Sequence, residues 1–200
     1  PTPAHNLNKS KDYYTIQDAI DHASIGDTIQ VDCGTYYETL LINKPIRLIG
    51  SCTEDTILYP SKNLDKYVIK ITGEKVNVSK FTIKGTEPDE SGDCIFVKSA
   101  TNCSITECIV SNREYGLRIS TSGSVVIKEN LFENTSYGVQ VLDSQNIVFR
   151  ENSFNNNSYG IKLTSSVATH ITGNSLNNSA VSIEGDLLEH WNTHTIDSSN

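Results

Sequence analysis

The chain has 200 residues, a formal net charge of −8 at pH 7 and a pI near 5.1. This acidic balance argues against nucleic acid as a partner, because binding to phosphates requires clustered lysine and arginine. Its apolar runs are short, so the sequence predicts no membrane span. No linker composition divides the chain, and a single domain over residues 1–200 is expected.

The first predicted element is a short amphipathic helix within residues 11–26. Four apolar residues share one helix face, at i, i+3, i+4 and i+7: Ile16, Ala19, Ile20 and Ala23. Thr15 is suited to cap the N-terminus of this helix, and Gly26 to end it. A helix ahead of a stack of strands is expected to cover the open end of the core.

Short extended segments follow the helix, each with apolar residues in alternation. They are residues 28–31, 39–42, 45–50, 67–71 and 94–97. The acidic, turn-rich stretch 86–92 interrupts this series and predicts a loop insertion.

A 22-residue repeat dominates the stretch from Asn112 to Asn178. The motif Tyr-Gly-apolar-polar-apolar occurs three times, at residues 115–119, 137–141 and 159–163. Each repeat contains three short runs with strand spacing and none with helix spacing. Three strands per repeat predict an all-β fold, a parallel β-helix whose coils lie about 4.8 Å apart. About eight coils of this period fit the chain.

Two columns of asparagine keep the same period: Asn130, Asn152 and Asn174, and Asn112, Asn134, Asn156 and Asn178. Asparagine at a tight bend adopts left-handed backbone angles and bonds to nearby backbone groups. Stacked side-chain amides are expected to donate to one another from coil to coil. Both columns are therefore predicted to be buried structural ladders.

The tyrosines of the repeat, Tyr115, Tyr137 and Tyr159, are expected to stack on the outside of the solenoid. The glycine after each tyrosine is expected because the bend requires a free φ angle. A second outward column contains Glu107, Glu129 and Glu151. Lys128 and Arg150 lie beside these glutamates and are expected to balance their charge.

These outward columns allow two interpretations. The first is a solvated, charge-balanced face, and the alternative is a strip that binds sugars through the tyrosines and glutamates. Catalytic solenoids need clustered acids and bases on neighbouring coils. No Asp–Asp or Asp–Arg pair recurs in this way in the regular coils, so no catalytic residue is predicted.

The opening segments resemble those of right-handed parallel β-helix proteins. The resemblance rests on residues 14–20, 26–31, 34–36, 44–46 and 48–50. This group includes NosD-like periplasmic proteins, pectin-methylesterase-like proteins and archaeal surface-layer proteins, and it is diverse in function. The closing stretch 191–200 is similar to a segment of archaeal surface β-helix proteins in which further chain follows. The C-terminal segment 187–200 is therefore expected to continue into more chain or to dock onto another copy.

Five cysteines are many for a cytosolic protein, and the number is odd. Cys33 and Cys52 both follow early strands and are expected to meet between adjacent coils. Cys103 and Cys108 lie in one coil, where they either pair or remain small buried thiols. Cys94 is then left as a partly buried free thiol or as an intermolecular bridge.

Two stretches contain residue types that bind metals. His190 and His194 have a metal-ligand spacing on a helix, but lie about 13 Å apart on a strand, the conformation expected there. The acidic insertion 86–92 offers oxygen ligands to calcium, although its spacing is not that of an EF-hand and a solvated loop is preferred. No cofactor is predicted. Scattered histidines and the absence of methionine also weaken a copper role.

Six Asn-X-Ser/Thr sequons begin at Asn8, Asn77, Asn102, Asn134, Asn156 and Asn177. Asn8, Asn77 and Asn102 are the predicted acceptors if the protein is exported. Asn134 and Asn156 are assigned to the buried ladder, where a glycan is not expected.

The leading prediction is a non-catalytic, secreted structural protein of a cell-surface layer or sheath. It would associate into a homo-oligomer or polymer through its solenoid edge or its cysteines. The alternative is a carbohydrate-binding or carbohydrate-active module with a polysaccharide partner. A NosD-like metal accessory protein is the weakest of the three.

Overall fold

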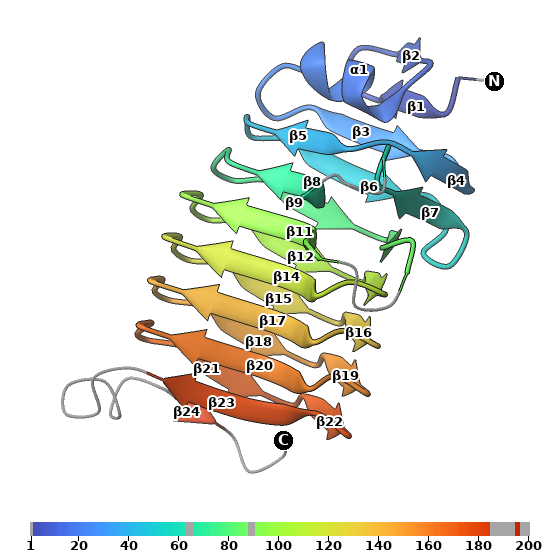
Figure 1. Ribbon diagram of the computed structural model, residues 1–200. Helices are drawn as coiled ribbons and strands as arrows, with labels where there is room; N and C mark the ends of the chain where they lie inside the picture. The colour runs from blue at the N-terminus through green and yellow to red at the C-terminus, as the bar shows by residue number, and fades with distance from the viewer. Residues whose placement is uncertain (1, 63–65, 88–90, 185–194, 197–200) are drawn as a thin grey trace.

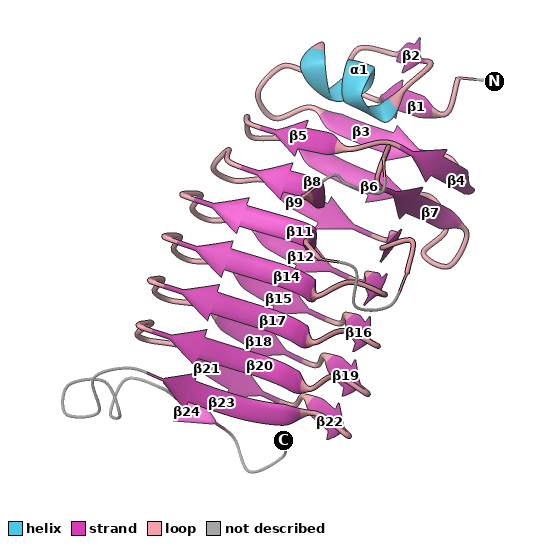
Figure 2. Ribbon diagram, in the orientation of Figure 1, coloured by secondary structure: helices cyan, strands magenta, loops and turns pink. Residues whose placement is uncertain are grey.

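The chain winds into a parallel β-helix, seen in a computed structural model that describes residues 2–62, 66–87, 91–184 and 195–196. Its coils stack in chain order from a cap at the N-terminal end (Figure 1). Three sheets run along the stack, and almost all of the regular structure is strand (Figure 2). The all-β solenoid predicted from the repeat is confirmed.

The three sheets are named A, B and C. Sheet A contains β2 (Lys11–Tyr13), β1 (Ala4–Asn6), β3 (Thr28–Val31), β6 (Arg47–Gly50), β9 (Asn77–Ser79), β12 (Ser104–Thr106), β15 (Val126–Lys128), β18 (Val148–Arg150), β21 (His170–Thr172) and β24 (Thr195–Ile196). Sheet B contains β4 (Gly34–Tyr37), β7 (Thr56–Tyr59), β10 (Thr82–Lys84), β13 (Ile109–Ser111), β16 (Leu131–Glu133), β19 (Ser153–Asn155) and β22 (Ser175–Asn177). Sheet C contains β5 (Leu40–Ile42), β8 (Tyr67–Ile71), β11 (Asp93–Lys98), β14 (Tyr115–Ser120), β17 (Tyr137–Leu142), β20 (Tyr159–Thr164) and β23 (Ala180–Glu184).

The number of coils is about seven, because sheets B and C have seven strands each in the described residues. The prediction of about eight fitted the period to all 200 residues, including the N-terminal ones. Those residues instead form an antiparallel hairpin, β1 and β2, and the helix α1 (Ile16–Asp21). The hairpin extends sheet A, since β1 also pairs antiparallel with β3. No antiparallel hairpin was predicted there.

The 22-residue period sets the register of the strands, because residues 22 positions apart are paired in neighbouring coils. Leu117 pairs with Val139, which pairs with Ile161, and all three are completely buried. Phenylalanines at the same step stack inside the solenoid, with the rings of Phe132 and Phe154 5.2 Å apart. The core is therefore a set of apolar columns that run along the axis, each of which removes its side chains from water.

A ladder of buried asparagines lies at the corner between sheets A and B. The Oδ1 atom of Asn152 accepts from Asn130 Nδ2 at 3.0 Å, and Asn152 Nδ2 donates to Asn174 Oδ1 at 2.8 Å. Each of these Oδ1 atoms also accepts from the backbone N–H of the preceding asparagine, at 3.1 and 3.0 Å. Cys108 continues the column, since its backbone N–H donates to Asn130 Oδ1. This predicted ladder is confirmed.

The second predicted ladder is displaced by one residue. Asn134, Asn156 and Asn178 have φ angles of 54–55° and exposed side chains, and only Asn178 bonds to its column neighbour, Asn156. The buried ladder at this corner, between sheets B and C, contains the residues that follow them: Thr135, Asn157 and Ser179. The left-handed residue turns its side chain outward, so the next residue points into the core. Asn112 has the same backbone geometry, with a φ of 60°.

A third ladder, which was not predicted, lies at the corner between sheets C and A. The backbone N–H of Ser122 donates to the Ser144 hydroxyl at 3.1 Å, and that of Ser144 to the Ser166 hydroxyl at 3.3 Å. The three serines are 22 residues apart in the sequence, so the period alone was a sufficient signal. Every corner of the solenoid is thus hydrogen-bonded along its axis, which satisfies buried polar groups from coil to coil.

Candidate functional site

Helix α1 sits over the first coil as the predicted cap, and its N-terminus is bonded to that coil. The Thr15 side chain accepts from the Asp18 N–H at 3.1 Å, as predicted. The Glu38 carboxylate accepts from the N–H groups of Ile16 and Gln17, both at 3.0 Å. An anion at this position also interacts favourably with the helix dipole. The helix ends earlier than predicted, at Asp21, and Gly26 is not its C-cap.

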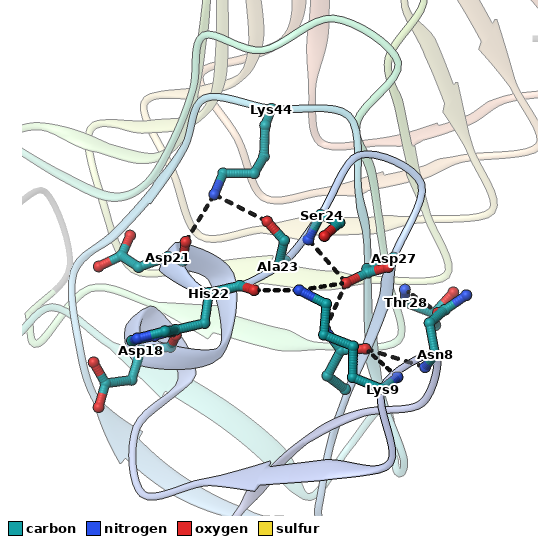
Figure 3. Close-up of polar contacts among 11 residues, drawn as sticks. Asn8, Lys9, Asp18, Asp21, His22, Ala23, Ser24, Asp27, Thr28 and Lys44 are labelled. Atoms are coloured by element: carbon teal, nitrogen blue, oxygen red, sulfur yellow. Dashed lines mark hydrogen bonds and ion pairs between the residues drawn. The ribbon is translucent and has the colours of Figure 1, made fainter.

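A charged cluster at the cap holds the other end of α1. Lys9 Nζ donates to the His22 carbonyl at 2.6 Å, and Lys44 Nζ donates to the Asp21 carbonyl at 2.9 Å (Figure 3). Asp27 is buried and accepts from Asn6 Nδ2 at 2.7 Å. This hydrogen bond lowers the pKa of Asp27. Lys44 belongs to the first coil and donates to a carbonyl of the helix, so this hydrogen bond holds the cap against the first coil.

The outer face of sheet C carries the tyrosine column predicted from the repeat. Tyr115, Tyr137 and Tyr159 are paired in register on β14, β17 and β20. The ring centroids are 5.0 and 5.4 Å apart, and the ring planes differ by 10° and 7°. The expected stack on the outside of the solenoid is confirmed.

This stacking covers the faces of the tyrosine rings. Each ring faces its neighbour along the axis, and Lys162 Nζ lies 5.7 and 5.4 Å from the centroids of Tyr137 and Tyr159. A ligand on sheet C would meet ring edges and hydroxyl groups. The column therefore joins neighbouring coils and offers little flat aromatic surface to a sugar ring.

An Asp–Arg pair lies on the same face of the solenoid. Arg118 Nη2 donates to Asp93 Oδ2 at 2.7 Å, and the Arg118 guanidinium lies 4.4 Å from the centre of the Phe96 ring. This single pair does not recur in the later coils, but it was not predicted from the sequence. Asp93 occupies the position that later coils give to tyrosine, since it pairs with Tyr115, and Arg118 reaches it from the next coil.

The Asp93 carboxylate is completely buried. Burial raises the pKa of Asp93 to about 6, although its ion pair with Arg118 opposes the rise. Its Oδ1 atom has no hydrogen-bond partner among the described residues. Arg113, also completely buried, donates to the Asp93 backbone carbonyl at 3.1 Å. A perturbed carboxylate is typical of functional sites, but here a ligand would reach the half-exposed Arg118 before Asp93.

The glutamate column lies at the corner between sheets A and B. Glu107, Glu129 and Glu151 have φ angles of 54–57° and point into solvent. Lys128 Nζ lies 3.0 Å from Glu129 and 3.6 Å from Glu151, so it joins two coils. Lys128 thus supplies the expected charge balance for two of the glutamates, whereas Arg150 forms no ion pair in the described part of the chain and Glu107 pairs with Lys80, at 3.8 Å. Exposed pairs of this kind contribute little to stability.

The cysteines are explained by their place in the stack. Cys33 and Cys52 form a disulfide with a Cα–Cα distance of 5.4 Å, as expected. Cys94, Cys103 and Cys108 are free and buried, with at most 1% of their surface exposed. Of the alternatives for Cys103 and Cys108, the structure has separate buried thiols. An intermolecular bridge through Cys94 is contradicted, because its sulfur lies in the core.

The remaining predicted sites are partly outside the described residues. His190 and His194 lie there, as does most of the segment 187–200, of which Thr195 and Ile196 pair with sheet A as β24. Residues 88–90 of the acidic insertion lie there too. The sequon residues Asn8 and Asn102 are exposed, whereas Asn77 is half-buried and its Oδ1 accepts from the Ser104 hydroxyl at 2.6 Å. The assignment of Asn134 and Asn156 to the interior is wrong, because both are exposed.

The profile of a family described as "NosD: Periplasmic copper-binding protein (NosD)" matches residues 50–199, three quarters of the chain. The chain belongs to the NosD family. The match begins at the end of β6, so the NosD profile covers the regular coils and not the helical cap.

Copper is the metal in the NosD family description, and the described residues of this NosD chain do not fit it. They contain no group of three or more His, Cys, Asp or Glu side chains placed to hold a metal. Both ring nitrogens of His5 are bonded, to Asp12 and to Asp32, and these hydrogen bonds raise the pKa of His5. Cys103 and Cys108 are buried, and burial raises the pKa of both thiols.

A curated relative of this NosD chain is a "Cell surface glycoprotein" of Methanothermus fervidus. The two are 31% identical over 109 residues, which cover 54% of this chain and only 17% of the relative. Among the described residues, no helix is long and apolar enough to cross a membrane.

Solved structures with low sequence identity share the solenoid fold. ORF18 of Geobacillus virus E2 aligns with a TM-score of 0.66 at 16% identity, over 77% of this chain and 38% of that one. An alginate lyase from Paenibacillus sp. str. FPU-7 aligns with a TM-score of 0.55 at 14% identity, over 84% and 70%. A pectin methylesterase in complex with a hexasaccharide aligns with a TM-score of 0.51 at 18% identity, over 88% and 64%. At these identities the likeness concerns the fold.

Proposed function

We propose that this chain is a rigid structural module of a protein at the cell surface. The observation that carries the proposal is that the outward side chains contact the neighbouring coils. The tyrosine column, the Lys128 and Lys162 ion pairs and the Asp93–Arg118 pair each connect one coil to the next. Side chains that would otherwise be available to a ligand are engaged in contacts between coils.

The internal ladders support the same role. A solenoid in which each coil contacts mainly its neighbours gains stability from the interface between coils. Here all three corners and all three sheets are hydrogen-bonded along the axis. Such a column resists bending and local unfolding, which suits a protein that bears load or spaces other parts of a surface assembly.

The surface location is supported by the relative named "Cell surface glycoprotein" and by the periplasmic description of the NosD family. The Cys33–Cys52 disulfide is consistent with it, because disulfides persist mainly in oxidising compartments outside the cytosol. Association of copies through the edges of the solenoid belongs to the same proposal. A covalent link through cysteine does not, since the three free thiols are buried.

A second candidate is binding of an acidic polysaccharide on sheet C. Arg118 is the observation in its favour, because its side chain is 31% exposed and lies on an aromatic ring. Structures with this fold include an alginate lyase and a pectin methylesterase bound to a hexasaccharide. Against it, the carboxylates of Asp93 and Glu184 already pair with Arg118 and Lys162.

The experiment is cell-surface labelling of the native protein followed by sedimentation of the extracted assembly. The structural proposal expects protein that is accessible on intact cells and is extracted as a non-covalent polymer. A soluble monomer inside the cell would contradict it. In parallel, alginate and polygalacturonate are tested for binding and cleavage. Saturable binding that Arg118→Gln abolishes would favour the second candidate.

A further inference from the structure

The corner between sheets B and C repeats one asparagine in four consecutive coils: Asn112, Asn134, Asn156 and Asn178. All four have φ angles of 54–60°, so the turn itself accounts for an asparagine in each coil. The turn does not require any particular residue two positions later, and this residue differs between coils: Glu114, Ser136, Ser158 and Ala180. Only Asn134 and Asn156 therefore complete an Asn-X-Ser sequon.

Asn156 presents both ends of its sequon to solvent. Its side chain and that of Ser158 are exposed, and only the residue between them, Asn157, is buried in the ladder. Asn156 Oδ1 accepts from Asn178 Nδ2 at 3.3 Å. Its own Nδ2, the atom that a sugar would join, makes no hydrogen bond among the described residues.

The other sequons are more constrained. Asn8 Oδ1 accepts from the Thr28 N–H at 2.8 Å, which ties this side chain to the first coil. The Ser104 hydroxyl, which belongs to the Asn102 sequon, donates to Oδ1 of Asn77, the first residue of another sequon. This one hydrogen bond therefore constrains both sequons. The Ser179 hydroxyl of the Asn177 sequon is part of the ladder and donates to the Phe154 carbonyl at 3.2 Å.

An open hollow of about 600 Å³ lies beside Asn156. Ala180 is the one residue without a polar side chain among those that line it: Asn156, Asn157, Ser158, Asn178, Ser179 and Ala180. A side chain larger than that of Ala180 would reduce the space in the hollow. A sugar attached to Asn156 would lie in this hollow with amide and hydroxyl groups around it.

We propose that Asn156 is an N-glycosylation site, with the first sugar of the glycan seated in this hollow. The inference rests on the surface location given under the proposed function. In the reaction, the Asn156 amide nitrogen forms a bond to the anomeric carbon of a lipid-linked oligosaccharide. The bond from that carbon to the lipid phosphate breaks, the phosphate leaves with its electron pair, and the amide loses one proton to a base. No oxidant or reductant is needed.

The stacking also limits how many glycans this corner carries. Asn134 lies one coil away from Asn156, and coils are about 4.8 Å apart. Two branched glycans on successive coils would occupy the same space. One glycan per chain is therefore expected in this column, with Asn134 blocked while Asn156 is occupied.

The test is secretion of the full chain, behind a signal peptide, from a cell line that performs N-glycosylation. Intact mass and glycopeptide mapping are compared for wild type, Ser158→Ala and Ser158→Thr. All three proteins keep the Asn156 side chain, and circular dichroism checks that they have the same fold. The expected result is a glycan at Asn156 in wild type and Ser158→Thr, lost from Asn156 in Ser158→Ala.

A secreted, folded wild type without a glycan at Asn156 overturns the proposal. Chains that carry glycans at Asn134 and Asn156 together overturn the limit of one. Because secretion is imposed by the signal peptide, these outcomes are independent of the native location. Surface labelling of the native protein tests the structural role separately, so either proposal can fail without the other.

Discussion

Gly138 lies directly against the backbone of Gly160 in the next coil. A Cβ atom on Gly138 would be 2.6 Å from the Gly160 carbonyl oxygen and 2.8 Å from Cδ1 of Phe154. Gly116 has the same relationship to Gly138, also at 2.6 Å. None of these glycines has a positive φ angle. The prediction that they serve a free φ is wrong, and close approach of stacked coils is the reason for them.

Gly138→Ala is expected to destabilise the protein by about 1–3 kcal/mol, because the new methyl group overpacks the interface between coils. Gly123→Ala is the matched control, since its Cβ would meet nothing closer than 3.7 Å. That change is expected to cost less than about 0.5 kcal/mol. Urea denaturation of both variants measures the difference, and equal effects would contradict the explanation.

Asn152→Ala is expected to lower the free energy of unfolding by about 2–4 kcal/mol. The change leaves the buried Asn130 amide and N–H without the acceptor they share. Asn134→Gly is the control, because Asn134 is exposed and glycine tolerates its φ of 54°. Thermal and urea unfolding distinguish the two columns. A loss of stability in Asn134→Gly as large as in Asn152→Ala would contradict the assignment of the ladder.

Asp93 is expected to make stability fall as the pH rises from about 4 to 6. Its pKa in the folded protein, about 6, is above its ordinary value of 3.8, so the folded state binds the proton more tightly. The contribution of Asp93 to the free energy of unfolding is fully present below pH 3.8 and is lost as the pH rises through 6. This contribution amounts to about 3 kcal/mol.

The measurement is the difference in unfolding free energy between wild type and Asp93→Asn across this pH range. Asparagine cannot ionise, so the variant gains on the wild type as the pH rises. Asp27, with its lowered pKa, contributes in the opposite direction in both proteins and cancels in the difference. A difference that does not vary with pH would show that Asp93 ionises as it does in water.

Loss of the Cys33–Cys52 disulfide is expected to destabilise the protein by about 3 kcal/mol, given a sequence separation of 19. Comparing the free energy of unfolding of the wild type with that of the double variant Cys33→Ala/Cys52→Ala measures this loss.

A thiol reagent should label none of Cys94, Cys103 and Cys108 in the native protein and all three in denaturant, because the folded core covers them. Rapid native labelling of Cys94 would restore the intermolecular bridge as an option.

Some functional candidates could be read from the sequence and others could not. The tyrosine and glutamate columns share the period, so their places on the surface were predictable. The Asp93–Arg118 pair was not, because Asp93 precedes the regular repeats and its partner is three positions beyond its register mate, Tyr115. The Ser122, Ser144 and Ser166 ladder keeps the period and was available to the same reasoning.

The sequence by itself determined the architecture, because side chains repeated every 22 residues can share apolar columns only if the coils lie in register. The tertiary structure decided which neighbour at each corner is buried. At Asn134 and Thr135 the left-handed backbone turns the first residue outward and the second into the ladder. It also decided why glycine follows each tyrosine, since the contact that excludes a Cβ comes from the adjacent coil and exists only once the coils have stacked.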